Sequence, residues 1–560
     1  MKSVVLVLTI ILFTSFFPVI FLNKTFFFAD NFMLMVPGKI FAVASLKQGI
    51  IPMWNPYIFS GVPFLADLSQ SFVYPSTLLF IFLSPATALS TSIIFHIFFG
   101  ACGMAMLSFL LWKNRYYALL SAISWMLSPI LIASVNNMAV TQSVSWLPWM
   151  IFFALRICEG SRIQLNQILL ITSMSLSIFG GHPYPFFYGG ILMGIFILMH
   201  PLSIAQKLKR FLPVVLLWIA LSSVILFPFL EAIGLSTRTR MSTTETTFGI
   251  LQPAHALSLF IPNMYSDTSN GITWGPDWGK AKTIVGYVSI IGIIAFVLLF
   301  GKWKILPMHQ RMLLSVGCVS LLYTFGLFLP LTSILYSNIP GFRFLRSPGE
   351  IGILWVMCSG LLLGVALEHV GKFCKTYGNI ILCACIAGGL TLCIGWIAQS
   401  FYFHNMWIFI DQLLVHKLSQ SVFHTEIRDA VIIKHVLLQI SIAVVMLGVS
   451  TWAVMQKRKI LLLSIITLDL WIASIPLLYF APHTIFEPQS LQSLFLQSQN
   501  IQNYRFLSLS GHLPWTGLPS YWDNMMIRPP FAESRVTLEE SQTFTQLKAR
   551  RDNLAMDWGM

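Results

Sequence analysis

The sequence predicts an all-α polytopic membrane protein with about 13 transmembrane helices, because a spanning helix needs roughly 20 mostly apolar residues and such segments recur along the chain. Of the 560 residues, 56% are hydrophobic and only 10% are charged, and the mean hydropathy is +0.77. A soluble chain carries about 25% charged residues. The composition therefore excludes a water-soluble globular protein, a disordered chain and a nucleic-acid-binding domain.

The spanning segments can be placed to within a few residues. They lie at 3–22, 87–112, 116–135, 143–157, 165–182, 184–200, 211–230, 285–301, 312–330, 350–367, 379–400, 435–455 and 460–481. The first is expected to remain as a helix, because Asn23-Lys24-Thr25 is not the small-residue cleavage site of a signal peptide. Proline kinks are expected within the bundle, since neighbouring helices can satisfy the freed backbone groups.

Basic residues set the expected orientation of the chain. With Lys2 in the cytoplasm, the short loops on that side hold sixteen basic residues against two acidic ones. The segments on the other side hold eighteen basic and seventeen acidic residues. The surplus of charge therefore lies on one face, as the positive-inside rule requires. We interpret it as a topology signal with a cytoplasmic N-terminus, and not as a sign of a nucleic-acid partner.

The long connections all fall on the opposite, extracytoplasmic face. They are a first loop at 23–86, a second at 231–284, a third at 401–434 and a tail at 482–560. Loops of this length are usually functional or disordered, and their content of Trp, Pro, Asn and Tyr indicates folded ones. None of the eight cysteines lies in them, so no disulfide framework is expected. The predicted organisation is a membrane domain at 1–481 followed by the extracytoplasmic tail.

The first loop begins with a pattern typical of a helix lying in the membrane interface. Between Val36 and Gly49, apolar residues recur at helical spacing with Lys39 and Lys47 beside them. A connecting helix with no further role fits the pattern equally well. Turn residues follow from Pro52 onward.

Several blocks then match one family in order along the chain. They are Pro52–Pro75 (PMWNPYIFSGVPFLADLSQSFVYP) with Asp30 upstream, Ser145-Trp146-Leu147-Pro148, Gly180-Gly181-His182-Pro183, Glu231 with Arg238, Ile339-Pro340-Gly341-Phe342 with Arg346-Ser347-Pro348, and Asp469-Leu470. Together these blocks resemble the bacterial YfhO-type membrane proteins, which belong with the GT-C glycosyltransferases. The first block is the specific one, and the later blocks gain their weight from their order.

The resemblance implies a GT-C-like bundle with interface helices in a large first extracytoplasmic loop. It also implies an activity, the transfer of a sugar from a polyprenyl-phosphate carrier on the outer face of a bacterial cytoplasmic (inner) membrane. The acceptor would be a cell-envelope glycan, teichoic acid or protein. Such a reaction needs a base for the acceptor hydroxyl, cationic groups or donors for the departing phosphate, and an apolar slot for the isoprenoid.

Asp30 is the candidate base. It follows an apolar run close to the expected membrane surface, and in the resembling enzymes the first-loop Asp is the catalytic candidate. The competing interpretation is structural, because an Asp at this position could cap a helix running from Asn31 to Val36.

Asp67 is the second candidate carboxylate of the loop. It could bind a sugar hydroxyl, assist Asp30, or ligate a divalent cation together with Asp30. A turn Asp that bonds its own backbone two residues on is the equally weighted alternative. No ligand spacing supports a metal, so no cofactor is assigned and a divalent cation remains an option only.

Other side chains of the loops are candidates for substrate contact. Trp54, Asn55, Tyr57 and Gln70 could stack on and bond a sugar, although the aromatic residues also fit simple interface anchors. His182 could donate to the phosphate or acceptor, or cap a helix end. Glu231 could orient the acceptor, or be a solvated helix end.

Arginines on the extracytoplasmic side oppose the positive-inside trend, which suggests a use. Arg346 and Arg238 are favoured for the carrier phosphate, with Arg343 beside them, and anionic lipid head groups are the alternative partner. Asp469, in the middle of an apolar segment, should face the bundle interior. We expect it to hydrogen-bond another helix, because it would lie far from an outer-face site.

Three functions compete at this point. An enzyme is favoured, because polar residues collect in the extracytoplasmic loops while a transporter should carry charges at several membrane depths. A carrier or flippase for lipid-linked intermediates is the second. A noncatalytic assembly factor of the envelope is the third.

Overall fold

The computed structural model describes residues 1–27, 30–58, 61–236, 250–267, 272–273, 286–329, 334, 348–401 and 426–486. Within these residues, six helical segments are long and apolar enough to cross a membrane. They are Pro85–Trp112, Met138–Cys158, Ile204–Leu235, Gly349–Trp396, Ile432–Met455 and Lys459–Leu477. Shorter apolar helices lie between them, and the described strands have two or three residues each. The prediction of an all-α polytopic membrane protein is confirmed, while the count of spans stays a prediction.

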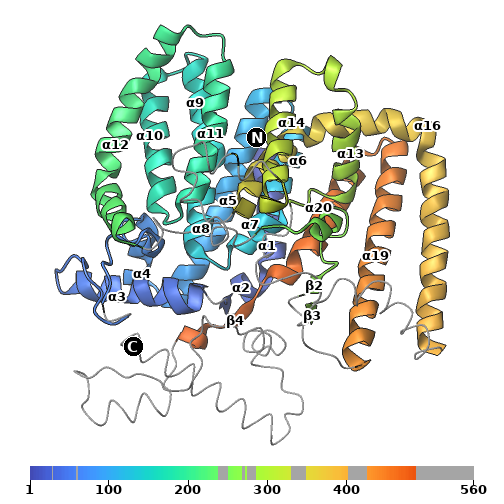
Figure 1. Cartoon of the computed structure of the whole chain (residues 1–560), viewed down its shortest axis with the longest axis horizontal. Coiled ribbons are helices and arrows are strands. Elements are labelled where there is room, and N and C mark those ends of the chain that lie inside the picture. The colour runs from blue at the N-terminus through green and yellow to red at the C-terminus, as the bar shows by residue number, and fades with distance from the viewer. Residues whose placement is uncertain are drawn as a thin grey trace, which may run out of the picture.

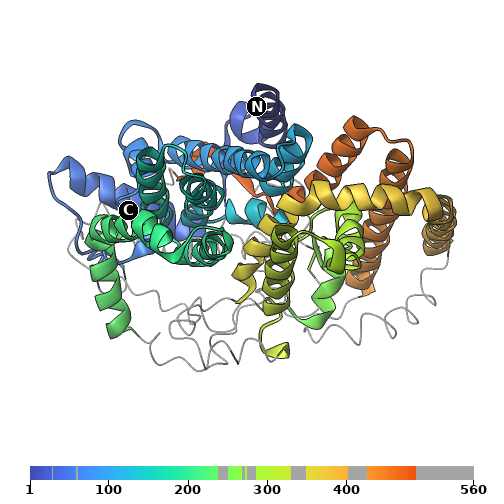
Figure 2. The ribbon, with the colours of Figure 1, turned by 90° about the horizontal axis from the view of Figure 1, so that it is seen from above.

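The helices form an elongated bundle with two halves and a centre, seen from the side in Figure 1 and from above in Figure 2. One half contains α9 (Leu147–Cys158), α10 (Ile163–Phe179), α11 (Pro183–Met199) and α12 (Ile204–Leu235). The other contains α13 (Ile290–Phe300), α14 (Met308–Tyr323), α16 (Gly352–Phe401) and α19 (Glu426–Met455). Between them run α5 (Pro85–Trp112) and α6 (Arg115–Met126).

Burial differs strongly across this bundle. In the most apolar part of Gly349–Trp396, 94% of the residues are buried, whereas the corresponding share for Ile204–Leu235 is 17%. The first half of α16 is therefore the centre of the core, and α12 is an edge helix. Exposed leucines and phenylalanines on α12, such as Phe227 and Leu235, have the character of a surface that faces lipid.

Prolines divide three of the predicted spans into two helices each. The first span becomes α1 (Lys2–Ser15) and α2 (Phe17–Phe21), and the third becomes α6 and α7 (Pro129–Ser134). The fourth, predicted at 143–157, starts earlier than predicted and consists of α8 (Met138–Val144) and α9. In each case a proline occupies one of the first two positions of the second helix. Proline is favoured there because its missing N–H would be unpaired anyway.

Two predicted boundaries differ from the structure. The segments 350–367 and 379–400 belong to one helix, α16, and the cytoplasmic loop expected between them is helical. Figure 1 shows that α16 changes direction along its length instead of ending. The last span also ends early, because α20 (Lys459–Ser474) gives way to a short 3-10 turn at Pro476. A proline removes one helical hydrogen bond and can end or kink a helix.

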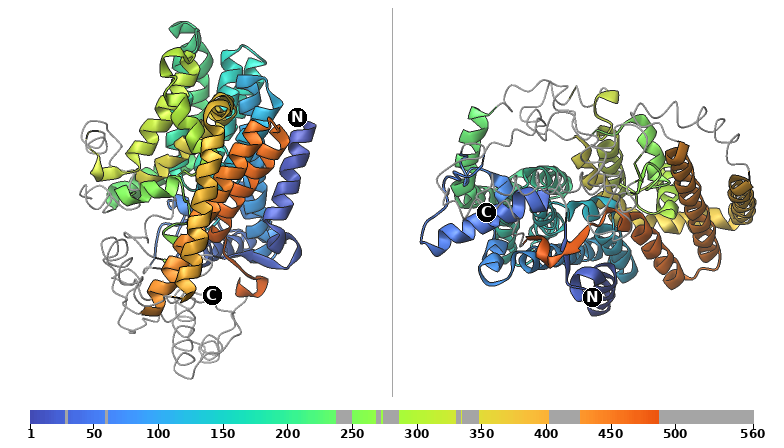
Figure 3. Two further views of the ribbon diagram at one scale, coloured as in Figure 1. Left: turned by 90° about the vertical axis from the view of Figure 1, so that its right-hand side faces the viewer. Right: turned by 90° about the horizontal axis from the view of Figure 1, so that it is seen from below.

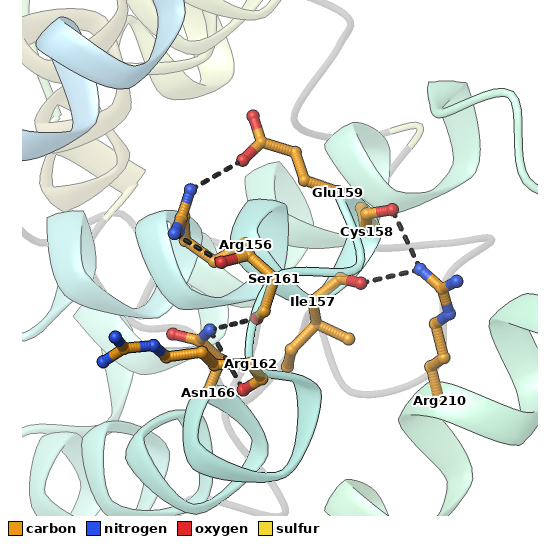
Figure 4. A network of polar contacts seen from close by, with 8 residues as sticks. All are labelled: Arg156, Ile157, Cys158, Glu159, Ser161, Arg162, Asn166 and Arg210. Atoms are coloured by element: carbon orange, nitrogen blue, oxygen red, sulfur yellow. Dashed lines mark hydrogen bonds and ion pairs between the residues drawn. The ribbon is translucent and has the colours of Figure 1, made fainter.

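The turn between α9 and α10 shows how basic side chains satisfy helix ends. Figure 4 shows Arg210, from α12, donating through Nη1 to the carbonyls of Ile157 (2.8 Å) and Cys158 (2.9 Å) at the end of α9. Arg156 pairs with Glu159 at 3.1 Å on the same turn. A cation at a helix C-terminus complements the unpaired carbonyls and the helix dipole. This turn lies at the end of the bundle opposite α3 (Figure 1).

Asp469 lies inside the bundle, as predicted, with 4% of its surface exposed. Its carboxylate accepts hydrogen bonds from the Tyr287 hydroxyl at 2.8 and 2.9 Å and from the Ile290 backbone N–H at 3.0 Å. Ile290 is the first residue of α13, so Asp469 holds the start of that helix against α20. The expected bond to another helix is confirmed.

The first loop starts in a small sheet. Strand β1 (Lys24–Phe26) pairs antiparallel with β4 (Phe480–Pro482), with Thr25 opposite Ala481. The start of the first loop is thereby joined to the segment that follows α20. In Figure 3 these dark blue and orange-red segments lie together at one end of the bundle. Strands β2 (Ser266–Asp267) and β3 (Ile272–Thr273) form a second small pair. All eight cysteines are free thiols.

Candidate functional site

The first loop lies across the end of the helix bundle. Its helix α3 (Val36–Lys47) runs roughly perpendicular to the long helices in Figure 1, and α4 (Leu79–Phe82) leads back toward α5. The predicted helix between Val36 and Gly49 is confirmed. The two lysines of this helix have different environments. The Lys39 side chain is completely buried, whereas Lys47 is exposed.

Lys39 is held by two oxygen atoms of the same loop. Its Nζ donates to the Ser71 carbonyl at 2.6 Å and to the Thr77 hydroxyl at 2.7 Å. Burial lowers the pKa of Lys39 well below its usual value, because the charged ammonium loses its water. Lys39 thus connects α3 by hydrogen bonds to the turn that follows Gln70. Its ammonium group does not contact lipid head groups at the membrane surface.

Asp30 stands directly before a π-helix, Asn31–Met35, and is exposed. Its side chain makes no capping hydrogen bond, so the interpretation of Asp30 as a side-chain cap is wrong. The backbone explains this, since Asp30 already has helical φ and ψ of −65° and −40°, whereas a capping residue is normally extended. The carboxylate instead accepts a hydrogen bond from Asn137 Nδ2 at 3.1 Å.

The contact between Asp30 and Asn137 is fixed on both sides. Asn137 caps α8, with Oδ1 accepting from the N–H groups of Ala139 and Val140. Asn31 is completely buried and bonds the same turn, donating to the Val135 carbonyl at 2.8 Å and accepting from the Met138 N–H at 2.9 Å. Asp30 is therefore a positioned, water-accessible carboxylate at the N-terminus of α8.

Asp67 is used within its own turn. Its Oδ1 accepts from the backbone N–H (3.0 Å) and hydroxyl (2.6 Å) of Ser69, and Oδ2 accepts from Gln70 Nε2 at 3.0 Å. This is the turn contact that the sequence analysis held as the alternative. Gln70 is buried, and its Oε1 has no hydrogen-bond partner. Asp67 and Asp30 thus have separate hydrogen-bond partners.

No group of three or more His, Cys, Asp or Glu side chains within the described residues could hold a metal ion. The divalent cation considered for Asp30 and Asp67 has no such cluster to support it in this part of the chain.

Trp54, Asn55 and Tyr57 belong to a hairpin at the tip of the loop. Asn55 pairs with Val62 through two backbone hydrogen bonds, and its side chain accepts from the Tyr57 N–H at 2.9 Å. Asn55 is buried, so its amide shapes the hairpin. Trp54 and Tyr57 are both more than half exposed. Their exposure suits either stacking on a ligand or anchoring in the interface.

His182 makes a contact that the sequence did not indicate. Its Nε2 lies 2.6 Å from a carboxylate oxygen of Glu350, which precedes α16 and is 168 residues away in the chain. About a quarter of each side chain is exposed. His182 directly precedes α11, and its imidazole makes no capping hydrogen bond to that helix; its backbone N–H bonds Ser143 Oγ at 3.0 Å.

Gly181 allows the His182 segment to approach the first loop. Its φ is +103°, and a Cβ there would lie 2.5 Å from the Leu68 carbonyl, 3.0 Å from the Ala139 side chain and 3.1 Å from the Ser71 side chain. Only glycine tolerates both the backbone conformation and the close contacts. The segment therefore packs between the first loop and α8.

Replacing Gly181 with alanine is expected to lower the unfolding midpoint of the detergent-solubilised protein markedly, since backbone strain and steric overlap add. The strain alone costs about 1–3 kcal/mol. Gly160 is the matched control, because it has a φ of +76° with nothing within 4 Å of an added Cβ. An equal decrease of the unfolding midpoint in both variants would show that the contact of Gly181 with the first loop does not contribute to stability.

A buried polar network joins the end of the first loop to the bundle. Trp146 Nε1 donates to the Tyr74 hydroxyl at 2.9 Å, and that hydroxyl lies 2.5 Å from His96 Nε2. His96 Nδ1 lies 2.6 Å from the Ser92 carbonyl, so it carries the proton, and Tyr74 donates to Nε2. Burial raises the pKa of Tyr74, which keeps this donor protonated.

The Tyr74→Phe variant is expected to lose about 1–3 kcal/mol of stability, because Trp146 Nε1 and His96 Nε2 would be left unpaired in a buried site. Thermal unfolding in detergent measures the loss. The Tyr57→Phe variant removes the same hydroxyl from a side chain that is 53% exposed, and its midpoint should stay at the wild-type value. A Tyr74→Phe midpoint equal to that of Tyr57→Phe would contradict the network.

Three of the predicted site residues, Arg238, Arg343 and Arg346, lie outside the described residues. Glu231 is described and exposed in the last two turns of α12. The structure also identifies residues that the sequence analysis missed, namely Asn31, Asn137 and Glu350. A signal existed for Glu350, since an acidic residue at the start of a helix after Ser347-Pro348 is a frequent N-terminal feature.

Three of the blocks quoted in the sequence analysis meet in space. The first-loop block contacts the second block through Tyr74 and Trp146, and the third through Leu68 and Gly181. The third reaches Glu350, next to the fifth block, through His182. We use the name α8 site for two groups that both contact α8 or its cap: Asp30 with Asn137 at the start of α8, and the His182–Glu350 pair, whose His182 backbone bonds Ser143 of α8. It combines an exposed carboxylate with a carboxylate–imidazole pair.

The comparisons with known proteins found a likeness among solved structures only. No family model matches the chain, and no curated protein matches it. Among solved structures, the chain is similar to ArnT from Cupriavidus metallidurans bound to undecaprenyl phosphate, with 12% sequence identity and a TM-score of 0.45. The match covers 90% of this chain and 80% of that one.

Proposed function

We propose that this protein is a membrane glycosyltransferase of the GT-C type, which moves a sugar from a polyprenyl-phosphate carrier to a cell-envelope acceptor on the extracytoplasmic face. Asp30 takes the proton of the acceptor hydroxyl. The acceptor is a glycan, teichoic acid or protein of the envelope. The membrane is a bacterial inner membrane, and the N-terminus lies in the cytoplasm.

The environment of the Asp30 carboxylate is the main support for this proposal. Asp30 is an exposed carboxylate whose side chain is not used to cap its helix, and a neutral amide holds it in place. A general base needs an ionised, accessible acceptor with a fixed position. Among the first-loop carboxylates, Asp67 already accepts three hydrogen bonds, so Asp30 is the better base.

The surrounding fold supplies other parts of such a reaction. Leu65, Leu68 and Tyr74 of the first loop share one apolar cluster with residues of α12, next to the exposed apolar surface of that helix. An isoprenoid tail can lie along such a surface while its phosphate stays at the membrane boundary. The proposed phosphate ligands are Arg346 and Arg238, with Arg343, since the guanidinium fork binds phosphate in a bidentate way.

A transfer assay tests the proposal against its alternatives. Proteoliposomes containing the purified protein receive radiolabelled polyprenyl-phosphate sugar and, separately, envelope acceptor fractions. Label appearing in the acceptor, with no label from protein-free vesicles, supports the transferase. Movement of the labelled carrier between leaflets without transfer would replace it with a carrier or flippase function. If the sugar is not transferred to any acceptor fraction and the carrier does not move between leaflets, the noncatalytic assembly factor becomes the supported function.

A further inference from the structure

We infer that His182 is the general acid that protonates the departing carrier phosphate, and that Glu350 is the residue that positions it. This inference rests on the proposed transferase function and adds a second proton-transfer group to it. The observation that carries it is the contact between His182 Nε2 and Glu350 at 2.6 Å within the α8 site.

The imidazole is fixed from several directions. Its backbone N–H bonds Ser143 Oγ at 3.0 Å, and the preceding Gly181 is packed against Leu68 and Ala139. The ring of Tyr184 meets it edge to face, with centroids 4.9 Å apart. None of the described residues bonds to His182 Nδ1. The ring therefore has one nitrogen committed to Glu350 and one free to meet a ligand.

The carboxylate determines what that free nitrogen can do. A carboxylate partner accepts only, so Nε2 carries the proton of the His182–Glu350 hydrogen bond. In the imidazolium, Nδ1 carries the second proton and faces away from Glu350. With 22% of the His182 side chain exposed, this proton is available to a phosphate oxygen at the surface of the site.

The two groups then divide the proton transfers of one reaction. The acceptor oxygen forms a bond to the sugar C1 and gives its proton to Asp30. The bond between C1 and the phosphate oxygen breaks, and its electron pair goes to that oxygen. His182 gives its Nδ1 proton to the same oxygen, so that the carrier leaves as a protonated phosphate. No oxidant, reductant or further reactant is required.

The assignment of base and acid follows from their partners. Asp30 is held by a neutral amide, which leaves its charge free to accept a proton. His182 is held through Nε2 by a carboxylate, so that Nδ1 is the nitrogen left to donate a proton to a ligand. The anchors of the two groups, Asn137 and Ser143, are six residues apart along α8, which corresponds to about 9 Å of helix. The two groups thus approach the site from different positions along one helix.

The leaving group provides the decisive test. Transfer is measured with two donors, a natural-type polyprenyl-phosphate sugar and an analogue that carries fluorine next to the phosphate. The fluorine makes the departing phosphate more acidic, so it leaves without being protonated. His182→Gln is expected to slow transfer from the natural donor by about 10²–10⁴-fold, and the loss should shrink at least about tenfold with the fluorinated donor. Glu350→Gln should show the same pattern with a smaller loss.

Two further variants serve as controls. Asp30→Asn acts on the acceptor side, so its loss should be equal for both donors. Glu159→Gln removes a carboxylate from the ion pair with Arg156 on the opposite end of the bundle, and it should transfer from both donors at the wild-type rate. Glu350→Gln added to His182→Gln should cause no further loss, because the carboxylate acts through the imidazole.

Each outcome of the test is distinct. If His182→Gln and Glu350→Gln lose the same factor with both donors, the pair is structural and the inference is overturned. If the wild-type protein transfers from neither donor, the proposed function itself fails. The general acid is supported if the loss of transfer rate is smaller with the fluorinated donor in His182→Gln and Glu350→Gln, and in no other variant.

Discussion

Replacing Asp30 with asparagine is expected to reduce sugar transfer by about 10²–10⁴-fold, the usual contribution of a positioned general base. Asparagine has the same shape and can still accept the hydrogen bond that Asn137 Nδ2 gives to Asp30. It cannot take a proton from the acceptor hydroxyl. The change therefore removes the chemistry of the side chain and leaves its contact in place.

The measurement compares initial rates of transfer at equal amounts of purified protein. Asp67→Asn is the matched variant, since it makes the same change in the same loop at a carboxylate that already accepts three hydrogen bonds. We expect Asp67→Asn to keep most of the rate and to lose some stability of the turn. A wild-type rate for Asp30→Asn would remove Asp30 from the mechanism.

Replacing Asp469 with leucine should have the largest effect on stability. Asp469 itself takes no direct part in the proposed reaction. The Tyr287 hydroxyl and the Ile290 N–H would both lose their acceptor in the core. Each unsatisfied buried group costs about 1–3 kcal/mol, so a loss of about 2–6 kcal/mol is expected. The start of α13 would also lose the negative charge that complements its dipole.

Thermal unfolding in detergent measures this loss, with Asp469→Asn as the control. Asparagine keeps one acceptor oxygen at the same place, so its midpoint should lie between those of the wild type and Asp469→Leu. If leucine is tolerated without a lower midpoint, the carboxylate does not hold α13 against α20.

The positions of the helices could be predicted from the sequence because they depend on local properties. Apolar runs of sufficient length mark the spans, and prolines such as Pro129 and Pro148 mark where they divide. The joining of two spans in α16 was missed, because two lysines and a glutamate in a short segment look like a loop. A helix accepts the same residues when it reaches the edge of the bundle.

The site was predictable in part for a related reason. Asp30 and His182 stood out through the blocks around them, and the structure places both in the α8 site. Their partners Asn137 and Glu350 come from distant segments, and no spacing in the chain indicates such pairs. Lys39 illustrates the same limit, since its complete burial depends on oxygen atoms more than thirty residues away.

Photoaffinity labelling tests the central claim most directly. A polyprenyl-phosphate sugar with a photoreactive group on the sugar ring is bound to the wild-type protein, irradiated, and the labelled peptides are identified by mass spectrometry. We expect label in peptides containing Asp30, Asn137 and His182, with unlabelled carrier competing it away. Label confined to the exposed faces of α12 and α19, with none near Asp30, would contradict the assignment of the α8 site.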